Sequence, residues 1–117
     1  MKILIVDDNR NIRLMIKALL SQSNSQLFEC EDGISSLEMC SKHNPDYVLM
    51  DFKMKYVDGI TATKNIKKKF PQIKIIMVSN YSDQDLSTEA LSAGAEFLLP
   101  KEDLYLLPKI ILEKMVY

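Results

Sequence analysis

Carboxylate, hydroxyl and ammonium side chains follow the short apolar runs of this sequence, and together they could bind a metal ion and a phosphate. Acidic residues follow the first and third runs, a serine follows the fourth and a lysine follows the fifth; they are Asp7, Asp8, Asp51, Ser79 and Lys101. Three ionised carboxylates about 5 Å apart repel by about 3 kcal/mol per pair at an effective dielectric of about 20, so they need a counter-charge. An all-oxygen site with few protein ligands suits Mg²⁺, which favours a shared phosphate.

Asp51 is the residue that we expect to accept a phosphoryl group. A carboxylate can act as nucleophile and form an aspartyl phosphate once a metal ion and a lysine neutralise the incoming charge. With the metal ion, Lys101 and the hydroxyl of Ser79 would form an electrophilic clamp around the oxygens of the transferred group. A lone acidic residue after a strand is more often a helix cap or a solvated side chain. The joint presence of Asp7, Asp8, Asp51 and Lys101 favours function instead.

The elements that would position these residues alternate between strands and helices. Apolar runs rich in β-branched residues predict strands at Ile3 to Val6, Leu27 to Glu31, Tyr47 to Met50, Ile75 to Val78 and Phe97 to Leu99. Apolar residues at helical spacing predict the helices between and after them: Ile12, Met15, Ile16, Leu19 and Leu20; Ile34, Leu37 and Cys40; Ile60, Ile66 and Phe70; Leu86 and Ala90; and Leu107, Ile110 and Ile111. We expect the last helix to begin near Tyr105 or Leu106, with Pro108 in its first turn.

This alternation predicts the fold class, which is α/β. Strands joined through helices cross over with the same hand and form a parallel sheet with helices on both faces. Five such units predict a doubly wound five-stranded parallel sheet in the order 2-1-3-4-5. Ligands bind such sheets at the carboxyl ends of the strands where the order reverses, which is between strands one and three. We expect residues 1–117 to form a single domain.

Composition excludes several other classes of protein. No apolar run approaches the ~18 residues that span a bilayer, and the first residues lack the pattern of a secretory signal, so we expect a cytoplasmic protein without a membrane segment. The net charge of -1 provides no basic field for direct binding of nucleic acid. Cys30, Cys40 and His43 lack the spacing and number of ligands of a zinc site, and we interpret both cysteines as reduced packing residues.

Short motifs occur along essentially the whole chain in a particular order and spacing: KILIVDDN (2 to 9), DYVLMD (46 to 51), Met54, Asp58-Gly59, Val78-Ser79, and Ala93-Gly94-Ala95 leading to Lys101. Together they give the chain a resemblance to the receiver domains of the response regulators of bacterial two-component systems. It implies the flavodoxin-like receiver fold with five helices. It also implies a phosphoprotein of phosphorelay signal transduction, a signalling switch activated by phosphorylation, rather than an enzyme.

The resemblance implies a role for each matching residue. Asp7 and Asp8 would bind Mg²⁺ together with Asp51 and the backbone carbonyl of Lys53. Asp51 would be the phosphoacceptor, while Ser79 would move to the phosphoryl group and Lys101 would pair with it; these are Asp7, Asp8, Asp51, Lys53, Ser79 and Lys101. The domain would assist its own phosphorylation and its slow dephosphorylation.

The same resemblance implies three kinds of partner. The donor would be a phosphohistidine on a sensor histidine kinase. The output would pass to a downstream effector domain or protein, or to a second copy of the chain through the fourth helix, the fifth strand and the fifth helix.

Some residues depart from the family pattern. Lys55 replaces a common proline, and Leu98 stands where the family often has its switch aromatic, with Phe97 one residue earlier; either residue could take part in switching. Lys53 and Tyr81 lie at positions that in the family flank the path of the attacking water. We therefore expect slow hydrolysis of the phosphorylated form.

Two other functions compete with this interpretation. A receiver-like fold could serve as a constitutive protein-interaction module that is not phosphorylated, but the presence of every residue of the predicted site argues against it. A flavodoxin-like enzyme or cofactor carrier would need a hydroxyl- and glycine-rich loop after the first strand, where Asp7, Asp8 and Asn9 repel phosphate unless a metal ion intervenes. The chain also has no G-x-x-x-x-G-K and no G-x-G-x-x-G motif.

Overall fold

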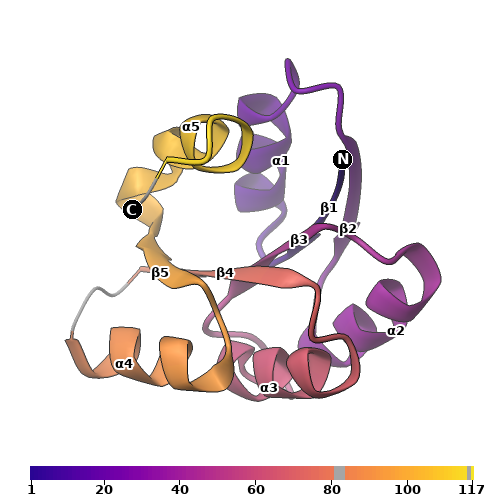
Figure 1. Cartoon of the computed structure of the whole chain (residues 1–117), viewed down its shortest axis with the longest axis vertical. Coiled ribbons are helices and arrows are strands. Elements are labelled where there is room, and N and C mark those ends of the chain that lie inside the picture. Colours follow the sequence, from indigo (N-terminus) through magenta and orange to yellow (C-terminus); the bar gives the residue numbers. More distant parts are fainter. Residues whose placement is uncertain (81–83, 116) are drawn as a thin grey trace.

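Five parallel strands form one sheet in the middle of the molecule (Figure 1). The structure is a computed structural model that describes residues 1–80, 84–115 and 117. The strands are β1 (Lys2–Val6), β2 (Gln26–Cys30), β3 (Tyr47–Asp51), β4 (Lys74–Ser79) and β5 (Phe97–Pro100). Their order is β2-β1-β3-β4-β5, which confirms the predicted topology. Each predicted strand begins and ends within 1 residue of the observed one.

Helices cover both faces of the sheet, as predicted. One face carries α1 (Arg10–Leu19) and α5 (Leu107–Leu112); the other carries α2 (Gly33–His43), α3 (Gly59–Lys69) and α4 (Gln84–Ala93) (Figure 1). A 3-10 helix, η1 (Lys101–Leu106), follows β5 and was not predicted, so α5 begins slightly later than expected, with Pro108 in its first turn. Among the described residues, no helix is long and apolar enough to cross a membrane.

Polar side chains cap the N-termini of three helices at the carboxyl edge of the sheet. The side chains of Asn9, Asp32 and Asp58 each accept a backbone N–H from the first turn of α1, α2 and α3, at 2.9, 2.7 and 2.8 Å respectively. Such caps satisfy donors that a helix leaves unpaired at its N-terminus, and they therefore fix where each helix begins. The spacing of Ser82 and Asp85 predicts a capping pair at the start of α4, but Ser82 lies outside the described residues.

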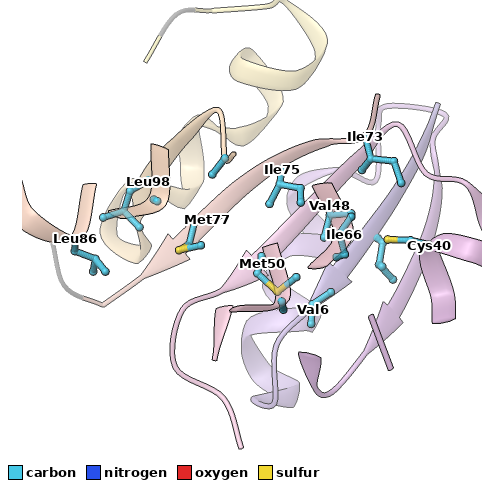
Figure 2. Packing of buried hydrophobic residues seen from close by; sticks show 14 residues of the cluster. Val6, Cys40, Val48, Met50, Ile66, Ile73, Ile75, Met77, Leu86 and Leu98 are labelled. Atoms are coloured by element: carbon cyan, nitrogen blue, oxygen red, sulfur yellow. The ribbon is translucent and has the colours of Figure 1, made fainter. Parts of the chain in front are cut away.

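Two apolar clusters pack on the two faces of the sheet. The cluster beneath α2, α3 and α4 includes Val6, Met50, Met77 and Leu98 (Figure 2). The cluster beneath α1 and α5 is built from the alternate strand positions, such as Ile5, Leu49 and Leu99. Because successive strand residues point to opposite faces, burial of both faces explains why the runs are continuously apolar.

The predicted apolar faces of α1 and α2 were partly wrong. Met15 is 45% exposed, and Arg13, at 7%, lies on the buried side of α1 because Glu29 pairs with its guanidinium group. Ile34 is 62% exposed, and the buried residues of α2 are the small Gly33, Ser36 and Cys40. Small residues face inward here because α3 approaches closely: a Cβ on Gly33 would lie 3.1 Å from the Cβ of Ala62.

Candidate functional site

Three carboxyl groups meet at the carboxyl edge of the sheet between β1 and β3. Asp7 and Asp8 directly follow β1, and Asp51 is the last residue of β3. Ligand oxygens of the three side chains lie within 4.8 Å of one another. Asp7 and Asp51 are only 2% and 4% exposed, whereas Asp8 is exposed. At this separation each ionised pair repels by about 3 kcal/mol at an effective dielectric of about 20, so the cluster attracts cations.

Lys101 brings one positive charge into this cluster from the end of β5. Its Nζ lies 3.2 Å from Oδ1 of Asp51 and 3.4 Å from Oδ2 of Asp7. A single ammonium group offsets only part of the charge of three carboxylates. The remaining negative charge and the oxygen ligands fit a hard divalent cation such as Mg²⁺.

Burial raises the pKa of the two inner carboxyl groups. The pKa of Asp51 is raised to about 6, first by burial and then by the nearby charge of Asp7, while Lys101 acts in the opposite direction. The pKa of Asp7 is also raised by burial, which outweighs the backbone N–H of Asn9 and the charge of Lys101. A bound cation would favour the ionised form of both groups.

The other predicted site residues lie around the same pocket. Ser79 is the last residue of β4, is 1% exposed and pairs in register with Pro100. Lys53 is exposed and lies at the rim. The pocket encloses about 240 Å³ and is lined by Asp8, Asn9, Asp51, Lys53, Ser79, Asn80 and Lys101. The structure therefore brings the predicted residues together, whereas Tyr81 lies outside the described residues.

Gly59 supports the site in a way that the sequence interpretation missed. Its backbone N–H donates to the carbonyl of Phe52 at 2.8 Å, which holds the start of α3 against the end of β3. A Cβ at this position would lie 2.3 Å from the backbone oxygen of Asp51 and 2.9 Å from the Cα of Phe52. The sequence identifies Asp58-Gly59 only as a motif, because this close approach depends on two segments that meet in space.

Leu98 and Phe97 point to opposite faces of β5. Leu98 is 6% exposed and belongs to the cluster that contains Met77 and Leu86, on the side of α4 (Figure 2). The ring of Phe97 packs with the other cluster and stacks on Tyr117, with 5.4 Å between the ring centroids. Of these two residues, Leu98 is therefore the one placed to respond to a movement of α4.

The fold and the pocket together define the class of the protein, which is a flavodoxin-like α/β domain with a charged pocket where the strand order reverses. Residues 3–111 match the family model of the response regulator receiver domain. The chain therefore belongs to the response regulator receiver family.

Known proteins resemble most of the chain. The chemotaxis protein CheY of Bacillus subtilis (strain 168) is 41% identical over 101 residues, which are 86% of this chain and 84% of that protein. The transcriptional regulatory protein DegU of Brevibacillus brevis is 33% identical over 103 residues, which are 86% of this chain but only 44% of DegU. The structure of the response regulator domain of Thermotoga maritima CheB matches with a TM-score of 0.85 and 29% identity, and the match covers 97% of this chain and 92% of that one.

Membership of the family establishes the general function. Receiver domains are switches that phosphorylation activates, and they are generally phosphoacceptors rather than catalysts of another molecule's reaction. They bind Mg²⁺ in an acidic pocket and interact with histidine kinases and effector domains. The acidic cluster at the edge of this sheet is the corresponding feature of this chain.

Proposed function

We propose that residues 1–117 form a single receiver domain in which Asp51 accepts a phosphoryl group from a sensor histidine kinase. Asp7, Asp8, Asp51 and the backbone carbonyl of Lys53 would hold Mg²⁺. The observation that carries this proposal is the position of Lys101 Nζ, 3.2 Å from Asp51 and 3.4 Å from Asp7 within a carboxylate cluster. An ammonium group in this position can neutralise both the nucleophile and the arriving phosphoryl oxygens.

The transfer exchanges one bond to phosphorus for another. A carboxylate oxygen of Asp51 attacks the phosphorus atom, and the new P–O bond forms as the P–N bond of the phosphohistidine breaks. The electron pair of that bond returns to the imidazole, which takes up a proton. Lys101 and the hydroxyl of Ser79 stabilise the charge on the phosphoryl oxygens, and bound Mg²⁺ supplies further positive charge.

Phosphorylation would act by shifting a conformational equilibrium. Movement of Ser79 and Lys101 toward the phosphoryl group favours one arrangement of α4, β5 and α5 over another. Leu91 and Tyr105, which lie on α4 and η1, are 56% and 67% exposed and offer apolar surface to a partner. The partner would be an effector domain or protein, or a second copy of the chain, and a cytoplasmic kinase domain as donor would place the protein in the cytoplasm.

We also propose slow hydrolysis of the phosphorylated form. The exposed side chain of Lys53 at the rim supports this, because it could obstruct the water that attacks phosphorus. The second residue invoked, Tyr81, lies outside the described residues. Lys53→Ala and Tyr81→Ala should each shorten the lifetime of the phosphorylated protein. Unchanged lifetimes in both variants would reject this part of the proposal.

Incubation with Mg²⁺ and acetyl phosphate, followed by intact mass spectrometry, tests the function directly. We expect the mass to increase by one phosphoryl group in the wild type and in Asp85→Asn, a matched change of an exposed aspartate on α4. Asp51→Asn should show no increase. An unlabelled wild type would favour the constitutive interaction module, and labelling of Asp51→Asn would place the acceptor elsewhere.

A further inference from the structure

A buried arginine outside the pocket contacts the backbone that carries the acidic pair. Arg13 lies on α1, and its side chain is 9% exposed. Its Nη1 donates to the backbone carbonyl of Asp7 at 2.8 Å, and its Nε donates to Oε1 of Glu29 on β2 at 2.8 Å. Arg13 thus ties the helix to the end of β1 and to the neighbouring strand.

Arg13 makes one of three hydrogen bonds that hold Asp7 through its backbone N–H, its side chain and its backbone carbonyl. The backbone N–H of Asp7 donates to the carbonyl of Cys30 at 3.2 Å, and its Oδ1 accepts the backbone N–H of Asn9 at 2.8 Å. The paired register of β1 ends at Val6, and the carbonyl of Asp7, one residue further, accepts from the side chain of Arg13. Removal of that donor leaves a buried acceptor without this partner, which is costly.

The guanidinium group is itself held in place. Oε1 of Glu29 accepts from Arg13, while Oε2 of the same carboxylate accepts from Nζ of Lys17 at 2.6 Å in an exposed ion pair that does not involve Asp7. Nη2 of Arg13 also lies 3.7 Å from the exposed carboxylate of Glu31. A planar guanidinium can donate to Glu29 and to Asp7 at once, whereas a lysine ammonium is a single point of charge.

We propose that Arg13 is a positioning residue for the metal site: by holding the backbone of Asp7, it fixes the direction of the two carboxylates that follow β1. This inference rests on the metal site of the proposed function. Loss of a residue that orients metal ligands typically costs about 10-fold or more in metal affinity. We expect Arg13→Met to weaken Mg²⁺ binding by about 10-fold.

Calorimetric titration of the purified full chain with Mg²⁺ tests the proposal without requiring phosphorylation. Arg13→Lys retains the charge but cannot keep both contacts, so it should also weaken Mg²⁺ binding. Lys17→Met is the matched control, because it removes a cation from Glu29 and leaves the contact with Asp7 intact. Its Mg²⁺ affinity should stay within about 2-fold of the wild type, as expected for an exposed ion pair.

A purely structural role makes a different prediction. It would lower the unfolding temperature of the Arg13 variants but leave the Mg²⁺ affinity of the folded protein unchanged, and that result would overturn the proposal. If Arg13→Met does not fold, Glu29→Ala provides a second test, because it removes the carboxylate that orients the guanidinium group and keeps Arg13 itself. Mg²⁺ binding should again be weaker than in the wild type. The proposal would also be overturned if the folded Arg13→Lys and Glu29→Ala variants bound Mg²⁺ with the affinity of the wild type.

Labelling with acetyl phosphate separates this inference from the proposed function. At saturating Mg²⁺ the labelling rate of Arg13→Lys should return to within about 2-fold of the wild type, since the lost affinity has then been overcome. A labelling rate that remains low at saturating Mg²⁺ would contradict a role in metal positioning alone. A wild type that binds Mg²⁺ but is never labelled would refute the proposed function, while the Mg²⁺ affinities would still decide the role of Arg13.

Discussion

The buried carboxyl group of Asp51 makes the metal-free protein sensitive to pH. Its pKa is raised to about 6, chiefly by burial, against the usual value of 3.8. Because the folded state favours the protonated form, this group stabilises the fold most at low pH, and the stabilisation is lost as the pH rises through about 6. The raised pKa of Asp7 acts in the same direction.

We therefore expect the metal-free protein to gain about 1 kcal/mol of unfolding free energy between about pH 7.5 and about pH 5. Glu29 does not obscure this gain, because its pKa is lowered from 4.5 by Lys17 and Arg13 and its stabilising contribution is lost only at more acidic pH. Urea denaturation in EDTA at the two pH values measures the difference. The gain in unfolding free energy should be smaller in Asp51→Asn. A gain as large as that of the wild type would mean that other titrating groups cause it.

Gly59 is a position at the site where there is no room for a side chain. Because a Cβ there would lie 2.3 Å from the carbonyl oxygen of Asp51, Gly59→Ala must displace either α3 or the end of β3. We expect a loss of about 2 kcal/mol of unfolding free energy, which is typical of overpacking, together with slower labelling by acetyl phosphate. Urea denaturation and intact mass measure the two effects.

Gly33→Ala is the matched comparison for this change. Gly33 also begins a helix directly after an aspartate cap, but its Cβ would approach other atoms no closer than 3.0 Å. Its cost should therefore be the smaller of the two, and its labelling rate should match that of the wild type. Equal effects of the two substitutions would show that a first-turn glycine matters for helix geometry alone.

The helices show how far periodicity alone could predict an element. In α1 the apolar spacing predicted the helix and the burial of Ile16 and Leu20, which are 2% and 1% exposed. It could not predict that Arg13 is buried in place of Met15, because that choice depends on Glu29 of β2. Periodicity also could not predict the 3-10 helix η1, because the three-residue spacing of the apolar Leu104 and Leu107 fits an α-helix equally well.

Substitutions on α1 should show the difference in burial between Ile16 and Met15. Ile16→Ala removes a buried side chain from the cluster beneath α1 and α5, and it should cost about 3 kcal/mol of unfolding free energy. Met15→Ala changes a side chain that is 45% exposed and should cost less than about 1 kcal/mol. Urea denaturation of both variants measures the costs. A larger cost for Met15→Ala would mean that this face of α1 is covered in solution.

At the scale of the whole molecule, the strand order assembles the site from distant parts of the chain. Because β1 and β3 are neighbours, Asp7 and Asp51 meet although 43 residues lie between them. The topology followed from alternating strands and helices, and the residues at the carboxyl ends of the strands then predicted the cluster. The contacts of Arg13 and Gly59 could not be predicted in this way, because they depend on distances between elements rather than on strand order.

The same assembly concentrates negative charge, so cation binding should stabilise the whole fold. The unfolded chain separates Asp7, Asp8 and Asp51, and Mg²⁺ should therefore bind the folded state in preference. At a concentration of about 100 times its dissociation constant, Mg²⁺ should add about 2.7 kcal/mol of unfolding free energy. Thermal or urea unfolding in EDTA and in increasing Mg²⁺ measures this shift.

Asp8→Asn separates charge neutralisation from metal binding. Asp8 raises the pKa values of both Asp7 and Asp51, so its replacement relieves repulsion, and the variant should unfold at a higher temperature than the wild type in EDTA. It should also gain less from Mg²⁺, because one carboxylate ligand is lost. Asp85→Asn, far along the chain on α4, should match the wild type in both conditions. Equal Mg²⁺ stabilisation of the wild type and Asp8→Asn would mean that the ion binds outside the acidic cluster, and the electrostatic basis of the site would then be wrong.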